Sequence, residues 1–178
     1  MDPEFLLIKR MKQGDEKAFD IFVRKYYDDI LAYCSHHLRG RQQAEDMTQE
    51  TFLRFFSGLA DYRYMGKTKN YLYTIAGNLC RDIYRKKEEL PGIDETVAGA
   101  PHEYAASYRD HEGDRLESLK AAVDMLPPEL REVVILHYFQ DLKIKDTAKV
   151  LGITVSLTKY RLGKARENLR KSMEKEED

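Results

Sequence analysis

Apolar positions recur every three or four residues along most of this chain, a spacing that places them on one face of an α-helix. The pattern is long after Asp15, a residue type that caps helix N-termini, and it stops at Gly40, a residue type common just after a helix ends. No segment alternates between apolar and polar residues as a strand does, so the predicted fold class is all-α. The helices expected in the first half cover residues 6–13, 16–39, 42–57 and 68–88.

A break in this pattern divides the chain. Residues 89–113 have no sustained period and contain two prolines and three glycines, which is typical of a linker. Residues 91–118 carry seven acidic residues against two arginines. We therefore predict a flexible acidic linker over 89–113 between two small helical domains, 6–88 and 114–175.

The second half contains a sequence of short helices. One apolar face, Leu116 to Leu126, ends before Pro127-Pro128, because a residue that precedes proline is disfavoured in the α region. Pro128 suits the first turn of the next helix. A short helix over 146–151, a turn at Gly152 and a helix capped by Thr154 then predict a helix-turn-helix, whose second helix enters a DNA major groove. An ordinary amphipathic helix with a basic, solvent-exposed face would show the same spacing of residues, so this alternative stays open.

Composition places the chain among globular proteins. It has 178 residues, 42% of them hydrophobic, and no apolar run that approaches the roughly 20 residues of a membrane span. Only two cysteines occur, Cys34 and Cys80, which excludes a disulfide scaffold and indicates a reducing, cytoplasmic setting. The first five residues are interpreted as a cloning scar and left out of the expected fold.

Charge is balanced overall but unevenly distributed. The net charge is −1, yet residues 63–87 carry seven Lys or Arg against one acid, and residues 157–171 carry six against one. Basic patches attract polyanions more than total charge does. The first patch also holds tyrosines, and aromatic rings beside cations suit unstacked single strands, although a core edge with solvated lysines has the same composition. The residues that mix aromatic rings with cations, just before and inside the helix expected over 68–88, are Tyr62, Arg63, Tyr64, Lys67, Lys69, Tyr71 and Tyr73.

The sequence contains little that indicates a catalytic site or a metal site. The five histidines show no metal-ligand spacing, and His137 on an apolar face is interpreted as a core residue. No phosphate-binding glycine motif is present. Cys34 and Cys80 both fall on apolar faces and are interpreted as small buried hydrophobes. We therefore expect no enzymatic activity, no metal and no cofactor.

Four segments, in this order, resemble the bacterial sigma factors of RNA polymerase. Residues 44–56 (AEDMTQETFLRFF) resemble the helix that binds core polymerase, and residues 71–87 (YLYTIAGNLCRDIYRKK) resemble the helix used on the −10 promoter element. Residues 126–134 (LPPELREVV) and 148–170 resemble the −35-reading domain. With these two domains alone, the chain is similar to the small extracytoplasmic-function (ECF) subclass.

The resemblance implies a role for each set of residues. One polar face would bind the clamp of the polymerase core: Asp46, Gln49, Glu50 and Arg54. A second set would hold the single-stranded −10 element, including a base flipped out of the duplex: Tyr62, Arg63, Lys67, Lys69, Asn78, Arg81 and Arg85. A third set would contact the duplex −35 element: Ser156, Leu157, Lys159, Tyr160, Arg161, Lys164 and Arg166. The subclass also implies an anti-sigma factor that covers the polymerase-binding faces. The lack of a long apolar run leads us to expect no membrane insertion.

Several positions depart from the family pattern. Lys143 stands where a Ser or Thr cap is usual, Leu157 cannot hydrogen-bond to a base, Tyr160 replaces a small polar residue, and Gly163 weakens its helix. The sequence therefore leaves open which bases of the −35 element the helix recognises.

Two other functions remain as alternatives. One is a helix-turn-helix repressor or activator that binds duplex DNA as a dimer without polymerase. The other is an RNA- or single-strand-binding enzyme that uses Arg81, Asp82 and Tyr84, although the sequence offers no nucleophile–base pair.

Overall fold

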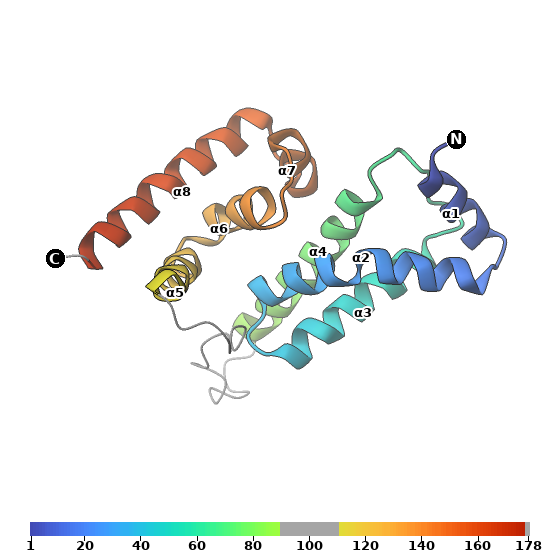
Figure 1. Cartoon of the computed structure of the whole chain (residues 1–178), viewed down its shortest axis with the longest axis horizontal. Helices are drawn as coiled ribbons and strands as arrows, with labels where there is room; N and C mark the ends of the chain where they lie inside the picture. The colour runs from blue at the N-terminus through green and yellow to red at the C-terminus, as the bar shows by residue number, and fades with distance from the viewer. Residues whose placement is uncertain (90–110, 177–178) are drawn as a thin grey trace. The chain divides into compact units, whose positions relative to one another are not determined.

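The chain folds as two separate helical units, Met1–His102 and Glu103–Asp178 (Figure 1). The computed structural model describes residues 1–89 and 111–176, and within these ranges every regular element is a helix, which confirms the predicted all-α class. The first unit contains α1 (Pro3–Lys12), α2 (Glu16–His37), α3 (Arg41–Ser57) and α4 (Thr68–Glu89). The second contains α5 (His111–Asp124), α6 (Pro128–Val134), the π-helix η2 (Ile135–Phe139), α7 (Ile144–Leu151) and α8 (Val155–Glu176).

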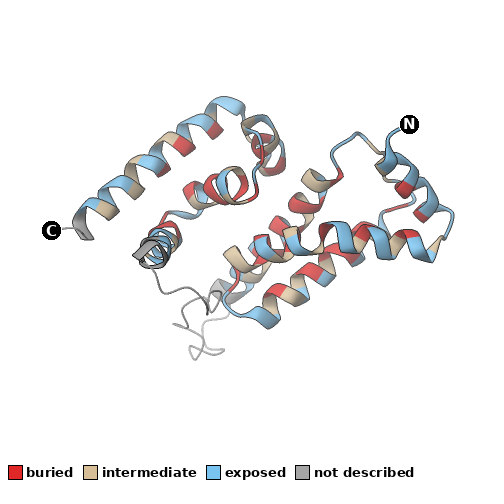
Figure 2. Cartoon of the chain, viewed as in Figure 1, coloured by how far each residue is buried: buried red, intermediate tan, exposed pale blue. Residues whose placement is uncertain are grey.

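Aromatic rings form the core of the first unit, where α2, α3 and α4 pack on one another. Buried positions recur along all three of these helices (Figure 2). Phe22 of α2 stacks on Phe55 of α3, with ring centroids 4.8 Å apart and the planes 9° from parallel. The ring centroids of Tyr33 in α2 and Tyr73 in α4 lie 5.2 Å apart, and both rings are fully buried. Burying such rings supplies most of the free energy that holds three helices together.

Two details at the helix ends correct the sequence-based expectation. Residues 2–5 are part of the fold, because the Asp2 carboxylate caps α1 by accepting the Glu4 amide at 2.8 Å. Gly40 does not end the second helix: α2 ends at His37, with Asp15 as its N-cap as predicted. Gly40 instead precedes α3, at a φ of 117° that side chains other than glycine rarely adopt.

The second unit is built around a smaller aliphatic core. Val123, Leu126, Leu130, Val134 and Ala165 form one buried cluster that joins α5, α6 and α8. Pro128 opens α6 as predicted. The π-helix that follows α6 was not predicted, since its wider turn has no signature in apolar spacing.

Part of the predicted apolar face of α5 is wrong. Leu116 and Leu119 are exposed, by 48% and 36%, because only the C-terminal half of α5 contributes to the buried cluster.

The predicted linker lies almost entirely outside the described residues. Helix α4 ends at Glu89 and α5 begins at His111, three residues before the predicted boundary at 114. Along the described part of the chain, no helix is both long and apolar enough to span a bilayer.

Gly77 marks a close approach of α4 to α2. A Cβ atom at this position would lie 2.8 Å from the Tyr33 hydroxyl oxygen, on a ring that is fully buried. We expect Gly77→Ala to lower the free energy of unfolding, because overpacking costs about 1–3 kcal/mol and alanine's helix propensity returns only about 1 kcal/mol. Circular-dichroism melting of the full chain measures the change.

Gly163 of α8 is the matched control, because an added Cβ there meets nothing within 4 Å. Gly163→Ala should raise the free energy of unfolding of the second unit by up to about 1 kcal/mol. Equal shifts from the two substitutions, in either direction, would contradict the steric interpretation of Gly77.

Candidate functional site

The outer side of α3 carries a row of polar side chains. Asp46, Gln49 and Arg54 are exposed and Glu50 is half-buried, so the structure brings the four predicted residues to one accessible side of the helix. The Arg54 Nε atom lies 2.9 Å from a Glu50 carboxylate oxygen. We call these four residues the α3 polar face.

Leu53 adds an apolar centre to this surface and was not predicted. It is 60% exposed and lies beside Arg54, whereas Phe52 and Phe55 are buried. Single exposed leucines are common on protein surfaces, but an apolar side chain surrounded by charged ones has the layout of an interface centre with a polar rim. Its lack of fit to the buried stripe of α3 is the sequence signal that could have identified it.

The segment between α3 and α4, residues 58–67, is the α3–α4 loop. Tyr62 of this loop is half-buried. Its ring stacks on Tyr71 with centroids 5.3 Å apart, and its hydroxyl donates to the Thr68 hydroxyl oxygen at 3.1 Å. Arg63 and Lys67 of the loop are exposed. The loop therefore presents cations beside an ordered aromatic pair.

Tyr73 is not accessible, which corrects the prediction that it belongs with the tyrosines and cations of the first basic patch. Its ring is fully buried against Tyr33, and this burial raises the pKa of Tyr73 above its usual value. Lys69 is directed toward α2, where its ammonium lies 2.8 Å from the Asp29 carboxylate. Tyrosines at 71 and 73 face different surroundings because two residues correspond to more than half a helical turn.

The exposed side of α4 carries a third polar row. Asn78, Arg81 and Arg85 are all exposed, and the Arg81 guanidinium donates to the Asn78 side-chain oxygen at 2.7 Å. Arg85 lies 3.4 Å from Asp82. The structure thus places these three predicted residues on one side of α4, following the α3–α4 loop.

In the second unit, α7, Gly152 and α8 form the predicted helix-turn-helix. Gly152 has the left-handed φ of 65° that this turn needs, and the Thr154 hydroxyl oxygen accepts the Leu157 amide at 3.1 Å. Lys143 precedes α7 without a side-chain cap, as predicted. Thr158 is fully buried, and its hydroxyl donates to the Thr154 carbonyl at 2.9 Å.

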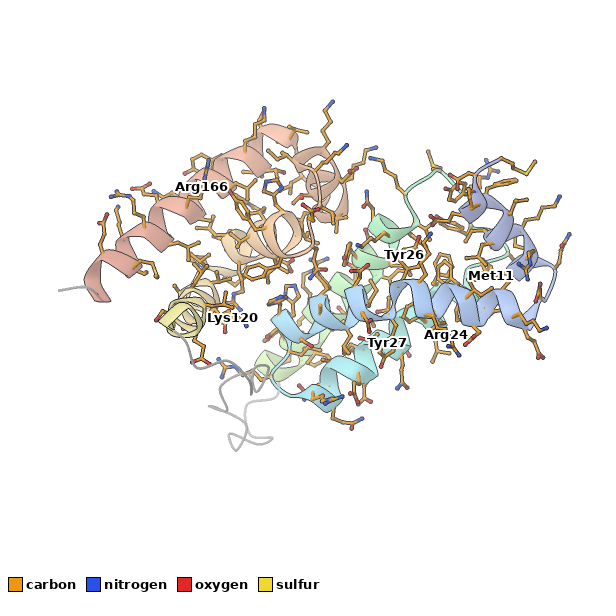
Figure 3. The ribbon with its side chains drawn as sticks, viewed as in Figure 1. Met11, Arg24, Tyr26, Tyr27, Lys120 and Arg166 are labelled. Atoms are coloured by element: carbon orange, nitrogen blue, oxygen red, sulfur yellow. The ribbon has the colours of Figure 1, made fainter. Side chains whose placement is uncertain are left out.

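The face of α8 that this turn exposes is basic. Among the seven predicted residues, Leu157 and Arg161 are half-buried and the others are exposed: Ser156, Lys159, Tyr160, Lys164 and Arg166 (Figure 3 labels Arg166). Tyr160 is 66% exposed. Lys164 lies 3.8 Å from Glu167, a carboxylate that Lys171 also contacts at 2.8 Å.

The described residues hold no cluster of three or more metal-ligating side chains. His137 is half-buried and so is not the core residue that was expected, and its Nδ1 atom lies 2.6 Å from the Leu142 carbonyl oxygen. Cys34 and Cys80 are both buried, as predicted. A hydrogen bond from Cys80 lowers the pKa of Cys34 despite its burial, and Thr48 contributes in the same direction.

Helix α1 makes contacts with the α3–α4 loop that the sequence did not predict. The Lys12 ammonium donates to the carbonyls of Ala60 and Tyr62, at 3.1 and 2.7 Å. The Tyr64 hydroxyl donates to the Asp2 carboxylate at 2.5 Å, which raises the pKa of Tyr64 to about 12. These partners are far apart along the chain, so no local pattern signals the contact.

Two family profiles match the chain in the same order as its two units. The family described as "Sigma-70 region 2" matches residues 22–89, and "Sigma-70, region 4" matches residues 116–169. The chain is 32% identical to the ECF RNA polymerase sigma factor SigW of Bacillus subtilis, over 93% of this chain and 94% of that protein. It is 28% identical to the RNA polymerase sigma-H factor of Pseudomonas aeruginosa, over 94% of this chain and 92% of that protein.

Solved structures share the fold. CnrH, solved in complex with the cytosolic domain of CnrY, matches with a TM-score of 0.74 and 21% identity, over 97% of this chain and 98% of that chain. RpoE of Bartonella quintana, solved with the anti-sigma factor NepR, matches with a TM-score of 0.71 and 24% identity, over 89% of this chain and 98% of that chain.

Together, a helical bundle followed by a helix-turn-helix unit and the two matching regions define a sigma-70-type transcription factor. The chain belongs to the ECF sigma factor family, as its similarity to SigW across nearly the full length of both proteins shows.

Proposed function

We propose that this chain binds the core of RNA polymerase and directs it to promoters that carry separate −10 and −35 elements. The observation that carries the proposal is the accessibility of all three polar surfaces: the α3 polar face, the α3–α4 loop with the exposed side of α4, and the N-terminal half of α8. The protein acts by binding and positioning, without catalysis of its own and without a cofactor, in the cytoplasm where polymerase lies.

The α3 polar face is the surface proposed for core polymerase. A charged rim around an exposed apolar side chain fits a protein partner, because the apolar centre supplies contact area and the charges set orientation. Leu53 is the centre, and Asp46, Glu50 and Arg54 lie around it. Water reaches both partners of the Glu50–Arg54 ion pair, whose side chains are 39% and 53% exposed, so a partner's charges can compete for it at little cost.

The −10 element is proposed to bind as a single strand on the α3–α4 loop and α4. Taking a base out of the duplex costs a few kcal/mol, so the loop must offset that cost with stacking and hydrogen bonds. Arg63 and Lys67 supply charge for the phosphates. Asn78 and Arg81 supply donors and an acceptor for base edges.

The −35 element is proposed to bind in duplex form on α8. A major groove admits one helix, and residues near the N-terminus of that helix reach base edges. Ser156, Leu157 and Tyr160 occupy this end, whereas Lys164 and Arg166 lie farther along, where phosphates are in reach. A leucine that reaches the groove contacts thymine methyl groups and donates no hydrogen bond.

An anti-sigma factor is the second proposed partner. The support on this chain is apolar exposure on both units, at Leu53 in the first and at Leu116, Met125 and Tyr138 in the second. An inhibitor that covers Leu53 would exclude core polymerase from the same surface. The balanced net charge of −1 also fits a protein that binds promoters only together with core.

Run-off transcription with purified core polymerase and a promoter library tests the proposal directly. A sigma factor yields core-dependent initiation at promoters that share two spaced elements. Duplex DNA binding as a dimer, without core and without initiation, would identify a helix-turn-helix repressor or activator instead.

Removing the acidic groups of the α3 polar face should weaken core binding. We expect Asp46→Ala with Glu50→Ala to raise the Kd for core by about tenfold, because the rim charges set the orientation of docking. The matched control is Asp20→Ala with Asp28→Ala on α2, which removes the same charge and another i,i+4 ion pair, Asp20 with Arg24. Fluorescence anisotropy measures both, and equal Kd values for the two double variants would refute the docking role.

Removing one cation of α8 should change the salt dependence of promoter binding. For Lys159→Ala, we expect the slope of log K against log salt to fall in magnitude by about one, because one phosphate contact is lost. Lys171→Ala, near the other end of α8, is the control and should leave the slope unchanged. The measurement is holoenzyme binding to one promoter at several salt concentrations; an unaltered slope for Lys159→Ala would mean that this face of α8 does not contact DNA.

A further inference from the structure

Lys12 joins two parts of the first unit that are distant in sequence. It is the last residue of α1, and its ammonium donates to two carbonyls of the α3–α4 loop, those of Ala60 and Tyr62. Figure 1 shows the loop passing beside α1. An ammonium has three donors, and here two of them hold the backbone on either side of Asp61.

Two further contacts connect α1 to the same loop. The Tyr64 hydroxyl donates to the Asp2 carboxylate at 2.5 Å, and the Phe5 and Tyr64 rings lie 6.0 Å apart. The loop is thus held at residues 60, 62 and 64, on both sides of the position where Tyr62 meets Tyr71. Four contacts to three of the five residues 60–64 leave the backbone of this segment little freedom.

Helix α1 is itself firmly attached to α2. Tyr26 donates its hydroxyl to the Glu4 carboxylate at 2.6 Å, and Lys25 lies 3.1 Å from the same group (Figure 3 labels Tyr26). Burial alone would raise the pKa of Glu4, but hydrogen bonds from Thr68, Tyr26 and Lys25 lower it, so the carboxylate stays ionised at neutral pH. Met11 is 2% exposed and adds apolar contact.

We propose that α1 is a brace that sets the shape of the α3–α4 loop, and that Lys12 is the positioning residue through which α1 tunes the capture of a flipped −10 base. This inference rests on the proposed function of the loop. A loop already held in its binding shape loses less conformational entropy when a base arrives, and a fixed shape discriminates between bases better than an adaptable one.

The first arm of the test uses the free full chain and needs no polymerase. Hydrogen exchange of amides 58–67 is compared among the wild type, Lys12→Met, Lys12→Arg and Lys9→Met. Lys9 lies on α1 and is exposed, so its substitution removes the same charge at a different position. We expect Lys12→Met to speed loop exchange by about tenfold, as loss of a charge-assisted contact implies, with Lys12→Arg between it and the wild type and Lys9→Met unchanged.

Tyr64→Phe is a milder variant for the same arm, because it removes one hydroxyl and leaves Lys12 in place. It should speed exchange within residues 63–66 without lowering the melting temperature of the unit. If Lys12→Met exchanges no faster than Lys9→Met, or Tyr64→Phe no faster than the wild type, the brace does not exist.

The second arm measures base discrimination by the holoenzyme. Single-stranded oligonucleotides carry the −10 sequence found by run-off transcription or its single-base substitutions, and the ratio of their affinities is determined. For Lys12→Met we expect this ratio to fall by about threefold to tenfold, while core affinity and the salt slope stay at the wild-type values. A purely structural role would weaken all oligonucleotides equally and leave the ratio unchanged, which overturns the inference.

A direct phosphate contact by Lys12 gives a different result, because the salt slope would then fall by about one; that outcome also overturns the positioning role. If wild-type holoenzyme initiates nowhere, the proposed function itself fails, and the exchange arm still reports separately on the brace.

Discussion

The packing of α2 against α3 through aromatic rings is the contact on which the first unit depends. Phe22 of α2 stacks on Phe55 of α3 and meets Phe52 of the same helix edge-on, with ring centroids 6.2 Å apart, so this one ring sets how α3 is rotated against α2. With Phe22 and Phe55 buried, the opposite side of α3 must face solvent, and that side carries the α3 polar face. The orientation of the proposed polymerase-binding surface is therefore a consequence of core packing.

In the second unit, too, core packing decides which side of a helix faces solvent, although the core residues are fewer and smaller. Ala165 and Leu162 bury one side of α8 against the preceding helices, which turns the basic side outward. The turn before α8 is set locally, by the left-handed Gly152 and the Thr154 cap. Because local residues set this turn, an unusual residue such as the exposed Tyr160 changes the side chains that α8 offers to a partner. It does not change the orientation of α8.

Much of the polar surface is engaged within the protein. Glu50 with Arg54, and Glu167 with Lys164 and Lys171, are ion pairs on exposed helix sides. Such pairs add little stability in water, so they can open when a polyanion or a protein partner offers stronger contacts. They also keep isolated cationic side chains from presenting full charge, which fits a factor that binds promoters through a larger assembly.

The sequence by itself determined the all-α class and the outward polar residues of α3, α4 and α8, because apolar period, caps and turn residues are local signals. Asp15, Pro128 and Thr154 each begin a helix as predicted for that reason. Only the tertiary structure decided that Tyr73 is core, that Leu116 is exposed, and that α1 holds the α3–α4 loop through Lys12. These outcomes depend on which helix lies opposite, and contacts between residues about fifty positions apart leave no trace in local spacing.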